Sequence, residues 1–352
     1  MPVFFRLILL FLAMVSLRPA FAADYTPDAD LQSYVWEYPM VRFNYYGYKA
    51  GVETLFRAYE HTSDKSLKPG EHGVVGIKIY TASGPGMRTP PNLVRAVVAC
   101  LEERGFDRKK LFLIDSNAER LRESGYLPRR DTSPNEFEGI PVYALDSGDY
   151  YDKEWSYDSN LPSRERVAMA ASNSRFSYED DPEERKSYLA YPLISQVDFW
   201  INLPMASDNK ALGISGALAN ATLWNISNNT RFLASPANAP VAVAEIAAIP
   251  ELRETWVFTL QTLERYQFMG GPRFNSLYTG QEPKLWLSAN PVAIDYLMWR
   301  RIYNGRARER FPVPDRDPQL FEYAQAVGLG NYKLDQLKLV RLQKAEGSDS
   351  SD

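Results

Sequence analysis

The sequence contains very little cysteine or histidine: among its 352 residues are one cysteine, Cys100, and two histidines, His61 and His72. One thiol can form neither an internal disulfide nor a cysteine-ligated cluster, so we expect no iron–sulfur cluster. A histidine-based metal site or a catalytic triad would have to recruit one of only two histidines, and we predict no metal site. Cys100 falls on the apolar side of a predicted helix, which favours a buried small hydrophobe over a reactive thiol.

The chain also has no excess of basic residues. It contains 40 lysines and arginines against 44 aspartates and glutamates, a formal net charge of −4 at pH 7. The basic residues do not gather with aromatic residues into a stripe, which is the pattern that nucleic-acid-binding proteins show. We therefore expect no nucleic acid partner.

A long apolar run occurs only at the N-terminus. Residues 1–22 combine a basic start at Arg6, an apolar core and the small-residue ending Ala20-Phe21-Ala22, which together are typical of a secretory signal peptide. The apolar core is shorter than the roughly 20 residues that a bilayer span requires. We predict a periplasmic or secreted protein, cleaved near Ala22, with no membrane span after signal removal.

Residues 74–116 have the pattern of one βαβ unit. The β-branched run 74–80 predicts a buried strand, and residues 81–88 are rich in glycine, proline and serine, as turns are. Thr89 is a suitable N-cap for a helix that begins at Pro90, and a second strand with a polar carboxyl end follows at 111–116.

The same alternation continues along the chain. Further strands are predicted at 197–204, 256–260 and 284–287, and helices at 213–223, 240–248 and 291–303, the last capped by Asn290. Alternating strands and helices predict an α/β fold with a mostly parallel sheet flanked by helices.

We divide the chain into four parts. Residues 1–22 form the signal peptide, residues 23–72 an aromatic N-terminal extension with a helix from about Arg42, and residues 73–344 a single α/β domain. This domain carries a polar, tyrosine-rich insertion near 134–191 with a helix around 164–171. Residues 345–352 are rich in glycine, serine and aspartate, and we expect a disordered tail.

Polar residues gather where three of the predicted strands end, at the edge where open parallel sheets bind ligands. The predicted ligand-binding residues are Ser83, Gly84, Gly86, Arg88, Thr89, Ser116, Asn202, Asn209 and Lys210. Amides at the start of the helix after Thr89 would add to the charges of Lys78 and Arg88, which favours a small anion such as a phosphate or a carboxylate.

Lys78, Asp115 and Asp295 are the catalytic candidates. A lysine between Ile77 and Ile79 in a buried strand needs an anionic partner, and either a bound anion or Asp115 would serve. If the protein is an enzyme, Lys78 would act as a base or an electrostatic group, with Asp115 or Asp295 as its acid/base partner.

Asp295 lies at the boundary of the buried stripe of the helix after Asn290. A carboxylate in that position needs a partner. We expect it to reach the carboxyl edge of the sheet and to pair with Lys78 or with the amides of the loop 83–88.

The order of these motifs resembles the domain of unknown function 362 family of bacterial and archaeal proteins, whose biochemical activity is largely unassigned. The matching segments are 75–78 with the glycine-rich loop and 89–94, 113–116, 198–204 followed by 213–220, 270–272 and 287–295. The resemblance implies an α/β fold. Many members carry cysteines for iron–sulfur clusters, so this chain resembles an exported member without them.

The chain departs from the family pattern at several polar positions. Tyr80 stands where the family has asparagine, and Ser207 and Asn209 stand where it has lysine and histidine. Ala219 replaces a lysine before Asn220, and Gln261 replaces an aspartate. Metal or redox chemistry inferred from the family therefore does not transfer to this chain, and the sequence specifies no cofactor.

Two functions follow from these patterns. The first is binding of a small anionic ligand at the carboxyl edge of the sheet, with turnover left open. The alternative is a non-catalytic periplasmic interaction module that has lost the polar site of the family and contacts a protein partner. One exposed patch made of Trp36, Tyr45, Tyr46, Tyr151 and Trp155 would favour the alternative, and burial of all five would remove its support.

Overall fold

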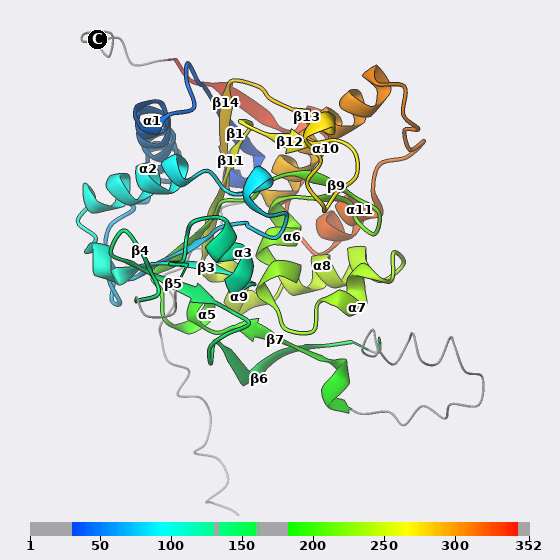
Figure 1. Ribbon diagram of the computed structural model, residues 1–352. Helices are drawn as coiled ribbons and strands as arrows, with labels where there is room; N and C mark the ends of the chain where they lie inside the picture. The colour runs from blue at the N-terminus through cyan, green and yellow to red at the C-terminus, as the bar shows by residue number, and fades with distance from the viewer. Residues whose placement is uncertain (1–29, 130–133, 160, 162–181, 344–352) are drawn as a thin grey trace, which may run out of the picture.

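The computed structural model describes residues 30–129, 134–159, 161 and 182–343 (Figure 1). The predicted signal peptide, the predicted helix around 164–171 and the predicted tail 345–352 lie outside the described residues. None of the helices that the structure describes is long and apolar enough to cross a membrane.

A mixed sheet of nine strands, counted over these described ranges, forms the centre of the protein, in the order β15-β1-β14-β11-β8-β2-β3-β5-β4. Its strands are β1 (Tyr34–Pro39), β2 (Val75–Lys78), β3 (Leu111–Asp115), β4 (Glu136–Phe137), β5 (Ile140–Ala144), β8 (Phe199–Asn202), β11 (Trp256–Thr262), β14 (Lys284–Ser288) and β15 (Lys338–Arg341). Strands β11, β8, β2, β3 and β5 are parallel to one another, whereas β14 runs antiparallel between β1 and β11.

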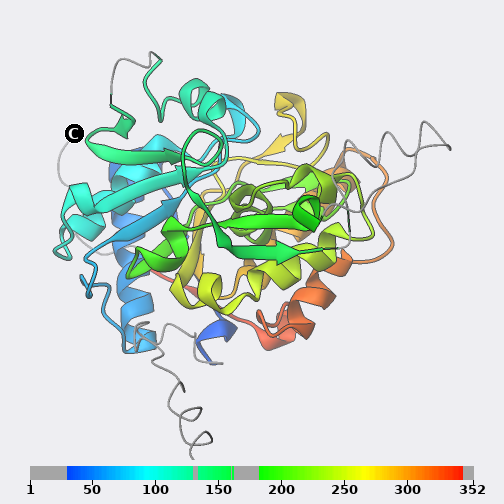
Figure 2. The same ribbon diagram turned by 90° about the horizontal axis from the view of Figure 1, so that it is seen from below.

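Helices cover both faces of this sheet, which confirms the predicted α/β fold. The helices are α1 (Tyr45–Ser63), α2 (Pro91–Glu102), α3 (Ala118–Glu123), α5 (Pro192–Ser195), α6 (Ala217–Ala221), α7 (Thr230–Leu233), α8 (Ala239–Ala247), α9 (Pro250–Thr255), α10 (Pro291–Arg308) and α11 (Gln319–Ala326). Figure 2 shows the blue and cyan helices α1 and α2 on one side of the sheet and the green to orange helices on the other.

The strands are apolar on both faces because both faces are covered. In β3, Leu111 and Leu113 pack into the core beside α1 and α2, whereas Phe112 and Ile114 pack into the core that contains α6, α8 and α10. Alternate residues of one strand therefore contribute to two cores, as the period of two requires.

Two smaller sheets lie outside the main one. Strands β9 (Ser207–Asn209), β10 (Gly213–Ser215), β12 (Tyr266–Gln267) and β13 (Thr279–Gly280) form one, and β6 (Tyr151–Asp158) with β7 (Lys186–Ala190) forms the other. Figure 1 shows the β6–β7 pair at the lower end of the molecule, well away from α1 and α2.

Three sequence-based boundaries need correction. Strand β1 pairs with β14 and β15, so the aromatic N-terminal segment is part of the main sheet and not only an extension packed on it. Strands β4 and β5, which we placed in the insertion, also belong to the main sheet. The predicted helix 213–223 begins as strand β10, because Gly213 has a φ of 81° and lets the chain turn back to pair with β9.

Candidate functional site

Lys78 and Asp115 form a buried ion pair at the carboxyl ends of β2 and β3. Lys78 Nζ donates to Asp115 Oδ1 at 2.7 Å, to Asn220 Oδ1 at 3.0 Å and to the carbonyl of Ile79 at 2.7 Å. Both charged side chains have 0% exposure. An ammonium has three donors, and all three are used inside the protein.

The carboxylate of Asp115 is equally well satisfied. Its Oδ2 accepts from the amide of Thr81 at 2.7 Å and from the Thr81 hydroxyl at 2.6 Å, and its Oδ1 also accepts from the amide of Ser116 at 2.8 Å. Burial lowers the pKa of Lys78, and the charge of Asp115 opposes that shift. Of the two anionic partners that the sequence leaves open for Lys78, the structure contains Asp115.

Two asparagines extend this network to α6. Asn220 Nδ2 donates to Asn202 Oδ1 at 2.7 Å, and Asn202 Nδ2 donates to the carbonyl of Ala217 at 2.8 Å. Both asparagines have 0% exposure. Asn202 and Asn220 therefore fix the ends of β2, β3 and β8 against α6, and their polar atoms face protein groups.

Asp295 does not pair with Lys78 or with the loop 83–88, so that prediction is wrong. Its carboxylate accepts from the amides of Ala217 at 2.5 Å and Leu218 at 3.0 Å. Helix α6 begins at Ala217, after the strand β10 that the sequence pattern did not indicate, and its first amides therefore face α10. A Cβ on Gly216 would lie 2.2 Å from Asp295 Oδ1, so the glycine permits this approach.

The burial of Asp295 predicts a pH-dependent stability. Burial raises the pKa of Asp295 to about 7 although both amide hydrogen bonds oppose the shift. An acid whose pKa is higher in the folded than in the unfolded state adds stability below its unfolded pKa, and that contribution is lost as the pH rises through the folded pKa.

We therefore expect the free energy of unfolding of the wild type, relative to that of Asp295→Asn, to fall by a few kcal/mol between about pH 4 and pH 7, since one pKa unit is worth about 1.4 kcal/mol. Asparagine keeps the shape of the side chain and cannot ionise. Urea unfolding of both proteins across this range measures the difference. Parallel curves for the two proteins would show that Asp295 does not titrate as described.

The glycine-rich loop after β2 packs against the side chain of Phe274. A Cβ on Gly86 would lie 2.2 Å from the ring of Phe274, and Arg265 Nη1 donates to the carbonyl of Gly86 at 2.5 Å. Ser83 Oγ donates to the carbonyl of Pro272. Gly84 has a φ of 78°, which suits a turn that only glycine adopts easily.

Thr89 is not the N-cap of α2, which corrects a second prediction. Its hydroxyl donates to the carbonyl of Leu203 at 2.7 Å and accepts from the amide of Tyr80 at 2.8 Å, so it joins the ends of β2 and β8. Pro90 takes the N-cap position and Pro91 begins the helix. Proline has no amide hydrogen, so the start of α2 offers few donors to an anion.

The remaining predicted ligand-binding residues have different surroundings. Asn209 Oδ1 accepts from the amides of Ala211 at 2.8 Å and Leu212 at 3.1 Å, which makes it a turn-forming side chain of the small sheet. Lys210 is exposed and Ser116 is half-buried beside Asp115.

Arg88 differs from Lys78 because its charge is not used. It is half-buried at the carboxyl end of the loop 83–88, and its guanidinium has no hydrogen bond, ion pair or ring contact with any described residue. Its charge nevertheless acts on neighbours, since it opposes the effect of burial on the pKa of Tyr126 and of Glu264.

Sequence reasoning missed Glu264, Arg265 and Tyr48. Glu264 lies two residues beyond the end of β11, and its Oε2 accepts from the hydroxyl of Tyr48, in the first turn of α1, at 2.6 Å. Tyr48 Oη and Thr262 Oγ1 lie 2.8 Å apart. Burial raises the pKa of Glu264, while Tyr48, Arg265 and Arg88 oppose the shift. The charged pair Glu264-Arg265, shortly after an apolar strand, was the signal available in the sequence.

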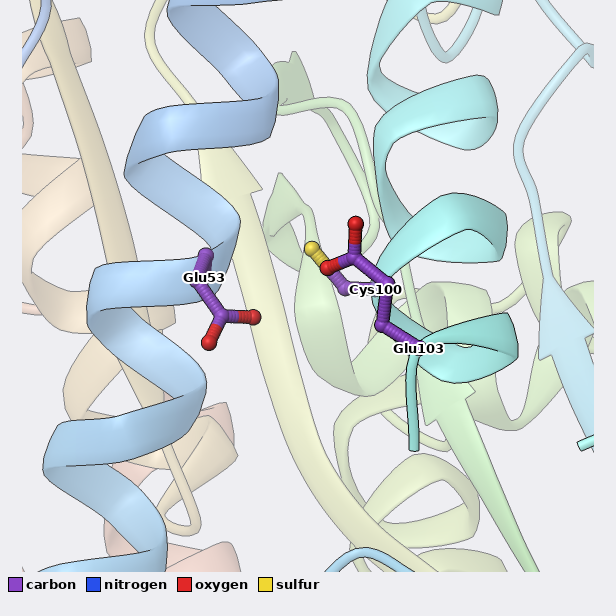
Figure 3. Close-up of side chains that lie close together, drawn as sticks. All are labelled: Glu53, Cys100 and Glu103. Atoms are coloured by element: carbon purple, nitrogen blue, oxygen red, sulfur yellow. The ribbon is translucent and has the colours of Figure 1, made fainter. Parts of the chain in front are cut away.

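A second cluster, between α1 and α2, brings Glu53, Cys100 and Glu103 together (Figure 3). Arg104 and Arg57 each lie 2.6 Å from a Glu53 oxygen, and Lys49 pairs with Glu103. Burial raises the pKa of the Cys100 thiol to about 12. A protonated thiol and carboxylates already neutralised by three cations do not fit a metal ion. The burial of Cys100 confirms that prediction.

The five aromatic residues proposed as an interaction patch do not lie together. Trp36 is buried in the sheet, whereas Tyr46 on α1 is 80% exposed and contacts Tyr45 edge to face. Tyr151 and Trp155 belong to β6 and pack, half-buried, against the core on the opposite face of the sheet from α1 (Figure 1).

Comparisons with known proteins add little. No protein-family model matches the chain, and no curated protein matches it. Among solved structures, the chain is similar to a crystal structure of a Thermotoga maritima protein determined by the Northeast Structural Genomics Consortium, with 11% identity and a TM-score of 0.37. The match covers 78% of this chain and 61% of the other, so it spans less than two thirds of that protein. The resemblance to the domain of unknown function 362 family therefore stays a prediction.

Proposed function

We propose that this protein binds a small anion, a carboxylate or a phosphate, at the carboxyl edge of its sheet, and that Arg88 is the main contact. The observation that carries the proposal is Arg88, a half-buried residue whose guanidinium has no acceptor among the described residues. A guanidinium has five N–H donors, and no described residue of the protein accepts from those of Arg88. A bound anion would supply the missing acceptors.

The chemistry of the side chain favours a carboxylate or a phosphate. The planar fork of arginine matches both groups through two parallel hydrogen bonds. Arg265 adds a second positive charge nearby, because it donates to the carbonyl of Gly86 in the same loop. The Lys78–Asp115 pair lies at the same edge of the sheet, and because its donors and acceptors are satisfied, it does not contact the ligand in this proposal.

The ligand would be met outside the cytoplasm. Residues 1–22 have the pattern of a secretory signal peptide, and a protein exported in this way encounters its ligand in the periplasm or the medium. Small anionic metabolites present there are the class to be tested.

The test is calorimetric titration of the mature protein with inorganic phosphate and with acetate at low ionic strength. Arg88→Gln should weaken the binding of whichever anion the wild type takes by about tenfold or more, as expected for loss of a charge-assisted hydrogen bond. Arg57→Gln is the matched control, because Arg57 lies on α1 and pairs with Glu53 at 2.6 Å. Absence of binding by the wild type, or equal binding by Arg88→Gln, would contradict the proposal.

A further inference from the structure

Two opposite charges face the same edge of the sheet without pairing. Arg88 ends the loop after β2, and Glu264 lies two residues beyond the end of β11. These two segments are in contact, because Arg265, the neighbour of Glu264, donates to the carbonyl of Gly86 at 2.5 Å. In agreement with this contact, the charge of Arg88 opposes the effect of burial on the pKa of Glu264. Neither side chain forms an ion pair with the other or with another charged group among the described residues. Both are half-buried.

The other groups around Glu264 leave one side of its carboxylate available. From α1, the Tyr48 hydroxyl donates to Oε2, and burial raises the pKa of Tyr48, so this hydroxyl stays protonated as a neutral donor. From its own strand end, Thr262 Oγ1 accepts from the amide of Glu264 at 3.1 Å. Arg265 points to the carbonyl of Gly86 and lies over the Phe274 ring, with its guanidinium carbon 5.7 Å from the ring centroid.

We infer that the ligand is a small zwitterion, such as an α-amino acid or the phosphate ester of an amino alcohol, whose anionic group contacts Arg88 and whose ammonium group contacts Glu264. This inference rests on the proposed function. A bare anion beside Arg88 would be repelled by the Glu264 carboxylate, whereas a ligand with both charges would give each protein group the partner that it lacks. An ammonium also supplies the donors that the free oxygen of Glu264 can accept.

Two matched pairs of probes test the inference by calorimetric titration at pH 7.5 and low ionic strength. Glycine is acetate with an added ammonium group, and O-phosphoethanolamine is ethyl phosphate with an added ammonium group. The wild type should bind at least one of the two bare anions, acetate or ethyl phosphate. It should bind the ammonium-bearing counterpart of that anion about tenfold more tightly, which corresponds to one charge-assisted hydrogen bond.

Variants locate the effect. Glu264→Gln should remove the advantage of the ammonium-bearing probe and leave the bare anion bound equally or more tightly, because the repelling charge is gone. Tyr48→Phe removes the hydrogen bond to Glu264 but keeps the charge of Glu264. The ammonium-bearing probe should therefore still bind more tightly than the bare anion in that variant. Tyr48→Phe thus also shows that loss of the contact between α1 and β11 alone does not abolish binding.

The outcomes separate the two claims. If a bare anion binds through Arg88 but the ammonium group gives no advantage, or if the advantage survives in Glu264→Gln, the inference is overturned and the proposed function stands. If neither member of either pair binds, or if Arg88→Gln binds all probes like the wild type, the proposed function is overturned together with the inference.

Discussion

Replacing Lys78 with methionine is expected to lower the free energy of unfolding by about 3 to 5 kcal/mol. The substitution keeps the length of the side chain but leaves the Asp115 carboxylate, with 0% exposure, without its cation. Only neutral donors from Thr81 and Ser116 would remain on that carboxylate. Urea unfolding followed by tryptophan fluorescence measures the loss.

Two further variants make the test of Lys78 specific. The double variant Lys78→Met with Asp115→Asn should lose less than the sum of the two single variants, because neither residue then leaves an uncompensated charge. Lys186→Met, which breaks the exposed pair with Glu183, should leave the unfolding curve unchanged. If Lys78→Met is as stable as the wild type, the charge of Lys78 is not held by Asp115 and is available to a ligand.

Replacing Asp208 with alanine is expected to be the second most destabilising change, at about 3 kcal/mol or more. Asp208 is 4% exposed, and its carboxylate accepts from the amides of Gly270 at 3.1 Å and Gly271 at 2.7 Å. It also forms an ion pair with Arg306 at 2.8 Å. Alanine would leave two amides and a guanidinium without this acceptor.

The loss should also loosen the segment 270–274 from the glycine-rich loop. In Asp208→Ala, hydrogen exchange at the Gly270 and Gly271 amides should become faster. The amides of β2 and β3 should still exchange more slowly than those of the two glycines. The exposed Asp146, which accepts from Asn117 Nδ2 and the amide of Ala118, gives a matched control in Asp146→Ala with little change in stability. Unchanged exchange at both glycines in Asp208→Ala would show that Asp208 does not hold the segment.

Local sequence patterns predicted strands β2, β3, β8, β11 and β14, because the apolar residues that form each of these strands are adjacent in the sequence. The β-branched run before Lys78 became β2, and the apolar run ending at Asp115 became β3, with the two paired in parallel as a βαβ unit requires. Asn290 caps α10 as predicted, since its Oδ1 accepts from the amide of Ala293 at 3.0 Å. The cap residue and the amide that it binds are only three residues apart, so the local sequence contains both partners of the interaction.

Long-range choices could not be predicted in the same way. The hydroxyl of Thr89 could cap a helix or bond to another strand. It donates to the carbonyl of Leu203, which lies over a hundred residues away in the chain, and does not cap α2. Asp295 accepts from the first amides of α6 and not from the glycine-rich loop. This contact is possible because β10 occupies the start of the predicted helix, so that α6 begins only at Ala217. Such outcomes depend on which elements pack together, and a single sequence does not show this.

The candidate residues Lys78, Asp115 and Arg88 lie at the carboxyl edge of the sheet, where the strand pattern placed them, but their interactions differ from those that we expected. Lys78 and Asp115 lie there and satisfy each other, whereas Arg88 keeps an unused charge. Glu264 lies beyond the end of a strand whose last residues we did not predict, and its relation to Arg88 depends on the parallel order of β2, β8 and β11.

The central claim is that Arg88, and not Lys78, contacts the ligand. The most direct measurement is nuclear magnetic resonance of both side chains in the mature protein, with the Arg88 Nε–H signal assigned from Arg88→Lys, during titration with the tightest-binding probe. We predict that the Arg88 Nε–H resonance shifts saturably while the Lys78 Cε resonance stays in place. A saturable shift of Lys78 with Arg88 unchanged, or no shift of Arg88 at saturating ligand, would contradict the account.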